Sequence, residues 1–206
     1  MHPNSAFRSD DRALMEMLID EIGFGMIFAS TPDGPRVAHT PLLSTGDGAL
    51  QFHLARGNAL SRHLAGAEVL ALVNGPDGYV SPRWYADKAQ VPTWNYVSLE
   101  LQGPVRRMDQ DGLLALLTSL TERHEARIAD GEAWSVDTMP QATLRQQMSA
   151  IIGFEMEVRA WRPTFKLSQN KSADDRECAI AGLERAGSPA IAALMRQLGT
   201  ASEGAA

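Results

Sequence analysis

The sequence contains almost no cysteine and no long apolar run. Its single cysteine, Cys178, excludes an intramolecular disulfide and a metal site built from several thiolates. No stretch approaches the roughly 20 consecutive apolar residues that a membrane helix needs. The first residues do not combine a basic segment with an apolar one. We therefore expect a cytoplasmic protein without a signal peptide or a membrane span.

Positive charge is also scarce. Nineteen Lys and Arg residues stand against 25 Asp and Glu residues, which leaves a net charge of −6. Binding to nucleic acid needs basic side chains that displace counterions from phosphates. The basic clusters are limited to Arg106-Arg107 and to the pair Lys166 and Lys171, and no helix-turn-helix pattern is found. We expect little direct binding to DNA.

Several motifs of known chemistry are missing. The sequence has no G-x-G-x-x-G, no P-loop, no H-E-x-x-H pair and no G-x-S-x-G elbow. His39, His53 and His63 could converge on a metal if the strands that carry them pair. Imidazoles that make local hydrogen bonds beside a cavity explain the three histidines better. We predict no metal site.

The chain is long enough for one domain with a core of its own, since 44% of its 206 residues are hydrophobic. We predict a single domain over residues 1–199 and a disordered tail over 200–206. Apolar alternation and turn residues place strands at 24–30, 36–45, 49–56, 68–75, 94–108 and 151–162. Helical spacing and capping residues place helices between Ser9 and Gly23, over 58–64, after Asp109, over 142–150, and after the caps Ser172 and Ser188. Strands gathered between terminal helices indicate an α+β protein built on an antiparallel sheet or barrel.

The corner Arg56-Gly57-Asn58 is a candidate phosphate site, because a strand ends there and the expected short helix begins. A guanidinium and helix N-terminal amides both suit a phosphate, and a glycine lets a ligand come close. The alternative is an ordinary strand-to-helix turn with an exposed arginine.

Aromatic and polar residues alternate in a second candidate region. The aromatic residues are Tyr79, Trp84, Tyr85, Trp94 and Tyr96. Such clusters usually form a core or a dimer interface, and they can also form a flat wall for a planar ring system. Polar residues interleaved among them favour an interface lined by a ligand. The donor-rich segment 166–171 is either a further ligand contact or a solvated loop before the helix that Ser172 caps.

Motifs along the chain resemble the PaiB-type FMN-binding regulators. They are His39-Thr40-Pro41-Leu42, His53 to Asn58, Gly75 to Tyr85, Val91 to Tyr96, Ile152 to Glu155, and Lys166 to Lys171. The resemblance runs roughly from Phe7 to Leu198. It implies an FMN-binding split β-barrel, related to the pyridoxamine-phosphate oxidase fold, with an N-terminal helix and C-terminal helices. It also implies a homodimer with FMN between the subunits and a role as a negative transcriptional regulator.

The same resemblance implies the site residues. His39, Thr40, Pro41 and Leu42 would lie along the isoalloxazine edge; His53, Leu54, Ala55, Arg56 and Asn58 would approach the ribityl phosphate; Trp94, Asn95, Lys166, Ser168, Gln169, Asn170 and Lys171 would reach in from the partner subunit. Two other functions remain open. One is a flavin-dependent oxidoreductase, since bound FMN supplies hydride chemistry. The other is a haem-binding or haem-degrading split barrel with a histidine as axial ligand.

Overall fold

The computed structural model describes residues 3–199, so the tail predicted at 200–206 lies outside the described residues. The chain forms two compact units. We call Arg12–Val73 with Glu100–Trp161 the barrel unit. We call the described residues of Met1–Asp11, Asn74–Leu99 and Arg162–Ala206 the terminal unit. The single domain expected over 1–199 stays a prediction.

Seven strands form one sheet in the order β4-β1-β2-β3-β6-β5-β7, and β4 also pairs with β5. Their bounds are β1 Phe24–Thr31, β2 Gly34–Ser44, β3 Ala49–Ala55, β4 Glu68–Val80, β5 Thr93–Arg107, β6 Ile151–Glu157 and β7 Ala160–Lys166. The pairings β1–β2, β1–β4, β2–β3, β3–β6 and β5–β6 are antiparallel. Because β4 pairs with both β1 and β5, the sheet closes into a barrel, and β7 pairs with β5 as an additional strand. The predicted α+β fold on an antiparallel barrel is confirmed.

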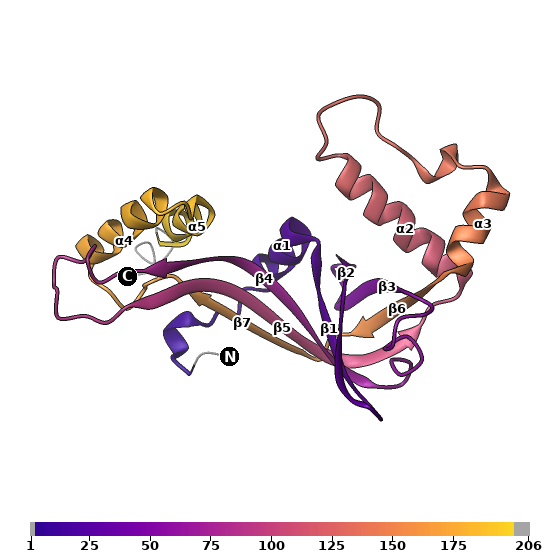
Figure 1. The fold of residues 1–206 in the computed structure, drawn as a ribbon, viewed down its shortest axis with the longest axis horizontal. Helices are drawn as coiled ribbons and strands as arrows, with labels where there is room; N and C mark the ends of the chain where they lie inside the picture. The colour runs from indigo at the N-terminus through magenta and orange to yellow at the C-terminus, as the bar shows by residue number, and fades with distance from the viewer. Residues whose placement is uncertain (1–2, 200–206) are drawn as a thin grey trace. The chain divides into compact units, whose positions relative to one another are not determined.

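The barrel unit has an apolar core between its strands. Phe52 on β3 and Phe154 on β6 are both fully buried, and their rings stack with centroids 5.5 Å apart. This pair follows from the register, which places Phe52 opposite Phe154. The helices of this unit are α1 Arg12–Ile22, α2 Gln110–Glu125 and α3 Gln141–Ser149, with a 3₁₀ turn, η2, at Val136–Thr138 (Figure 1). Leu116 and Leu120 of α2 pack against Leu43 of β2.

The terminal unit combines strand ends with two helices. It holds the 3₁₀ turn η1 Ser5–Phe7 and the helices α4 Ala173–Arg185 and α5 Pro189–Gly199. Figure 1 shows α4 and α5 side by side over the end of β4. A Cβ on Gly78 of β4 would come within 2.6 Å of Leu183 on α4 and 3.1 Å of Ile191 on α5. Glycine is needed there because the strand and the two helices approach so closely.

Most predicted elements are present, but one predicted helix is missing and one predicted strand is divided. Residues 58–64 form turns and no helix, because isolated bonds such as Ser61 N–H to Asn58 O reach back only three residues. The strand expected over 151–162 is two strands. Between them the Val158 N–H bonds to Gly48 O and the Arg159 N–H to Gln102 O, so the chain changes partners there.

Two predicted N-caps are confirmed, and the first helix begins later than expected. Asp109 caps α2 through Gly112 N–H, and Ser172 caps α4 through Asp175 N–H. The first helix begins at Arg12, three residues after Ser9, whose hydroxyl accepts from Asp11 N–H instead. Within residues 3–199, no helix is long and apolar enough to cross a bilayer.

Candidate functional site

The predicted site residues fall into two groups, one in each unit. The barrel unit carries His39, Thr40, Pro41, Leu42, His53, Leu54, Ala55, Arg56 and Asn58, and the terminal unit carries Trp94, Asn95, Lys166, Ser168, Gln169, Asn170 and Lys171.

In the first group, strand alternation separates core residues from accessible ones. Leu42 and Leu54 are buried in the core, while the side chains of His39 and Ala55 are exposed. Thr40 is buried, and its hydroxyl donates to His53 O at 2.6 Å, which ties β2 to β3. Leu42 and Leu54 therefore contribute packing beneath the accessible positions.

His53 has a buried imidazole nitrogen without a partner. Among the described atoms, none forms a hydrogen bond with its Nδ1. Burial lowers the pKa of His53, which keeps the imidazole neutral at physiological pH. A neutral ring with an unpaired nitrogen can accept from, or donate to, a bound group.

Arg56 lies at the edge of a cleft of about 420 Å³. Its Nε donates to Ser149 O at 2.9 Å and its Nη2 to Ile151 O at 3.4 Å, so the guanidinium also braces the start of β6. Arg107 lines the same cleft, beside the N-terminal residues Asp109 and Gln110 around the start of α2. Neither arginine takes part in any ion pair within the described range.

This cleft differs from the phosphate site that the sequence suggests. The helix expected after Asn58 is not formed, and the Asn58 side chain caps a turn through Leu60 N–H. The helix N-terminus that borders the cleft is that of α2 instead. Two guanidinium groups and a helix N-terminus fit a phosphate, and the one carboxylate beside them, Asp109, is engaged with Gly112 N–H. Sequence reasoning missed Arg107 as a neighbour of Arg56, because their proximity depends on the pairing of β5 with β6.

In the terminal unit, polar side chains line a second pocket of about 240 Å³. Asn95 is fully buried there, and its Nδ2 donates to Ser168 Oγ at 2.9 Å and to Met195 Sδ at 3.3 Å. Lys166 Nζ donates to Thr93 Oγ1 at 2.5 Å. Burial and the nearby charge of Lys171 lower the pKa of Lys166.

Lys171 belongs to a chain of contacts that ends at a buried carboxylate. Its ammonium donates to Gln90 Oε1 and lies 5.2 Å from the centre of the Tyr85 ring. Gln90 Nε2 and the Ala86 N–H both donate to Asp175, each at 2.9 Å. Burial alone would raise the pKa of Asp175, but the hydrogen bonds from Gln90 and Ala86 outweigh it and the pKa is lowered. Neither Gln90 nor Asp175 is among the site residues predicted from the sequence.

Gln169 and Asn170, the two remaining predicted site residues of the segment 166–171, make different contacts. Gln169 folds back on its own chain, since its Nε2 donates to Phe165 O and its Oε1 accepts from Leu167 N–H. Asn170 is exposed and lines the pocket of Asn95 and Lys166.

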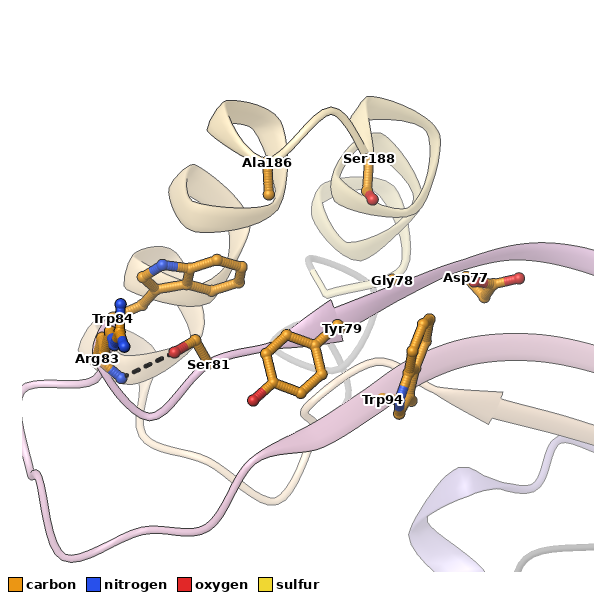
Figure 2. Close-up of a pocket in the computed structure, with 9 residues that line it drawn as sticks. All are labelled: Asp77, Gly78, Tyr79, Ser81, Arg83, Trp84, Trp94, Ala186 and Ser188. Carbon is orange, nitrogen blue, oxygen red and sulfur yellow. Dashed lines mark hydrogen bonds between the residues drawn. The ribbon is translucent and has the colours of Figure 1, made fainter.

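Trp94 and Asn95 lie on opposite faces of β5, because successive side chains of a strand alternate. Trp94 lines a third cleft, of about 660 Å³, together with Asp77, Gly78, Tyr79, Ser81, Arg83, Trp84, Ala186 and Ser188 (Figure 2). The Tyr79 and Trp94 rings pack edge to face, with their centroids 6.0 Å apart. Tyr85, which the sequence grouped with them, is fully buried instead.

Across residues 3–199, His, Cys, Asp and Glu side chains form no group of three that could hold a metal ion. His39, His53 and His63 therefore do not converge on one point.

The comparisons with known proteins agree on one family and one fold. A family model described as "Putative FMN-binding domain" matches residues 1–160. The chain is 29% identical over 175 residues to the protease synthase and sporulation protein PAI 2 of Bacillus subtilis, and the match covers 83% of each chain. An uncharacterised protein of Emericella nidulans is 28% identical over an alignment of 201 positions, and the match covers 80% of each chain.

Two solved structures share the architecture. The FAD and heme binding protein from Mycobacterium smegmatis has a TM-score of 0.62 at 21% identity, over 84% of this chain and 80% of that one. A flavocytochrome from Azotobacter vinelandii has a TM-score of 0.62 at 13% identity, over 86% of this chain and 78% of that one. At these identities the likeness shows a common fold, the flavin-binding split barrel.

Proposed function

Since the chain belongs to the FMN-binding family whose model matches residues 1–160, we propose that it binds FMN as a homodimer and serves a regulatory role. The family match supports a flavin as the ligand. The cleft of Arg56 and Arg107 supports a phosphorylated flavin, and this is the observation that carries the proposal. FMN ends in a phosphate, which two guanidinium groups and the start of α2 can hold.

The barrel unit offers suitable groups for the rest of the flavin. His39, with its exposed side chain, and Pro41 would border the ring edge, above the buried Thr40 and Leu42. His53 would use its unpaired Nδ1 toward the flavin, as a neutral imidazole. Bound FMN supplies hydride and one-electron chemistry. The contacts predicted from the partner subunit for Trp94, Asn95 and residues 166–171 stay part of this proposal.

A homodimer is the expected assembly, because large apolar side chains such as Ile128 and Trp134 are exposed and the family resemblance implies FMN between subunits. Light scattering at micromolar concentration should report a particle of twice the chain mass of 22.4 kDa. A particle of a single chain would remove the shared site.

The ligand itself is tested by the absorbance spectrum of the purified protein, followed by chromatography of the ligand released on denaturation. We expect flavin bands, and released FMN rather than FAD. A haem Soret band without flavin bands would contradict the proposal and favour the haem alternative.

The phosphate site is tested by titrating the flavin-free protein with FMN and with riboflavin. Arg56→Ala and Arg107→Ala should each weaken FMN roughly 10- to 150-fold, since a hydrogen bond to a charged group contributes about 1.5–3 kcal/mol. Riboflavin lacks the phosphate, so its affinity should change little. Arg36→Ala, at an exposed position on β2, is the matched control. Equal losses for both flavins would mean that Arg56 acts only as the brace of β6.

The regulatory role draws on the likeness to PAI 2 of Bacillus subtilis, which is named as a protease synthase and sporulation protein. The net charge of −6 favours an effect that does not pass through direct DNA binding. The oxidoreductase alternative predicts that a nicotinamide cofactor bleaches the flavin bands faster when a substrate is added. A regulator without enzyme activity predicts no such acceleration.

A further inference from the structure

The third cleft, which we call the aromatic cleft, has walls that are fixed before any ligand arrives. The indole of Trp84 lies flat on the backbone of α4 at Gly182, where a Cβ would overlap the ring. Gly78 likewise lets β4 pack directly against Leu183 and Ile191. Preformed walls lower the ordering cost of binding.

The walls of this cleft are aromatic and accessible. Tyr79 is 46% exposed and Trp94 54% exposed, although both are large apolar side chains. Figure 2 shows the two rings standing next to each other, with Ala186 and Ser188 across from them. The volume of about 660 Å³ lies within the range of 300–1,000 Å³ that is typical of small-molecule pockets. Exposed aromatic faces in a concave site suit a planar ring system.

The two ends of the cleft carry opposite charges. Arg83 lies beside Trp84 at one end, and Asp77 lies beyond Trp94 at the other (Figure 2). Among the described residues, no acidic side chain forms an ion pair with Arg83. A guanidinium without a counter-charge, next to an aromatic wall, favours a carboxylate on the ligand, and Asp77 favours a donor at the far end.

We propose that the aromatic cleft binds a small planar aromatic carboxylate, with its acid group at Arg83 and a hydroxyl or amino group toward Asp77. The cleft shares no lining residue with the proposed flavin phosphate site at Arg56 and Arg107, and Trp94 is the one residue of the cleft that the proposed function also gives to the flavin. The core of an interface between two copies of the chain would be depleted of charged residues. Because this cleft carries a charged residue at each end, a small polar aromatic ligand fits it better than a second copy of the chain.

The test is a calorimetric titration of the purified protein, with any bound flavin retained, using 6-hydroxy-2-naphthoate as the probe and 2-naphthol as the uncharged analogue. We expect one naphthoate per chain. Arg83→Gln should weaken the naphthoate about tenfold and leave 2-naphthol unchanged, because only the charge-assisted contact is lost. Tyr79→Leu should weaken both compounds, and Arg36→Gln should weaken neither.

Three results would overturn the proposal. The first is an absence of binding at millimolar naphthoate, or an Arg83→Gln variant that binds as the parent does. The second is release of flavin in step with naphthoate binding, which would make the cleft the seat of the flavin ring. The third is dissociation of a dimer by the naphthoate in light scattering, which would make the cleft a subunit interface. A protein purified without flavin would contradict the proposed function and leave this titration interpretable.

Discussion

The barrel unit and the terminal unit differ in the partners that most of their buried polar side chains bond to. In the barrel unit a buried polar group such as Thr40 bonds to a neighbouring backbone carbonyl, and the interior is apolar around Phe52 and Phe154. In the terminal unit buried polar side chains bond to one another. Asn95 meets Ser168, which is 73 positions away in the sequence, and Gln90 meets Asp175.

The difference shows two ways to build a site. Alternation along paired strands fixes which barrel residues face outward, so the accessible groups rest on an independent apolar core. In the terminal unit the polar contacts are themselves part of the interior, and one change leaves several groups without partners. Substitutions in the two units should therefore differ in how much stability they remove and in whether the loss depends on pH.

The largest effect is expected in the apolar core of the barrel. Phe52→Ala removes half of the stacked pair with Phe154 and should lower the free energy of unfolding by about 3–5 kcal/mol. Urea denaturation followed by far-UV circular dichroism measures it. The control is Phe24→Ala on β1, where the side chain is 51% exposed, and a loss below about 1 kcal/mol is expected there. If both variants lost a similar free energy of unfolding, the distinction between core and surface positions in this unit would be wrong.

A moderate effect is expected where the terminal unit is most tightly packed. Gly182→Ala places a methyl group where the Trp84 ring lies, and overpacking of this kind costs about 1–3 kcal/mol. The tryptophan emission should shift as the indole moves. Gly57→Ala is the matched control, since a Cβ there meets nothing within 4 Å. An unshifted spectrum with unchanged stability would show that the wall of the aromatic cleft is adaptable.

A smaller effect that depends on pH is expected at Asp175. Its folded pKa is lowered by the bonds from Gln90 and Ala86, so the carboxylate form stabilises the fold above the unfolded pKa of about 3.9. That contribution is lost as the pH falls through the lower folded pKa. Asp175→Asn should therefore lower Tm at pH 7, and the difference from the parent should shrink below about pH 4.

Thermal scans between pH 3 and pH 7 measure this prediction. Asp174→Asn, at the exposed neighbouring position of α4, is the control variant in the same scans. A constant difference at Asp175 across that range would mean that its charge is not part of the network.

The smallest effect is expected for DNA. Neither unit concentrates enough basic residues, and Arg106 is already paired with Glu155 at 2.5 Å. Titration of a labelled duplex at low and moderate salt should give weak binding with a shallow salt slope. Tight binding that falls steeply with salt would make the regulatory role a direct one.

The sequence allowed much of the barrel to be predicted and little of the terminal network. Alternation in 151–157 predicted β6, and the caps Asp109 and Ser172 predicted the starts of two helices. The break between β6 and β7 was missed, because it depends on pairing with Gly48 and Gln102 elsewhere in the chain.

For the candidate site, the sequence allowed several site residues to be picked out, but it did not show which residues lie next to them in the fold. The family resemblance, which the comparisons confirm, drew attention to Arg56 and Asn95. Arg107, Gln90 and Asp175 became apparent only from contacts between distant segments. The separation of Trp94 from Asn95 follows from alternation and could have been predicted from the strand alone.

Ser168 has one further consequence, for how this chain tolerates change. It is the one non-glycine residue with positive φ in the described range, at 63°, a conformation that costs an L-residue about 1–2 kcal/mol. Its hydroxyl is held by Asn95. A library randomised at position 168 and selected for thermal stability should recover asparagine, which adopts this conformation at lower cost and, unlike glycine, keeps a polar group for the buried Asn95. The same library selected for ligand retention should recover serine. The two selections should therefore yield different residues at position 168.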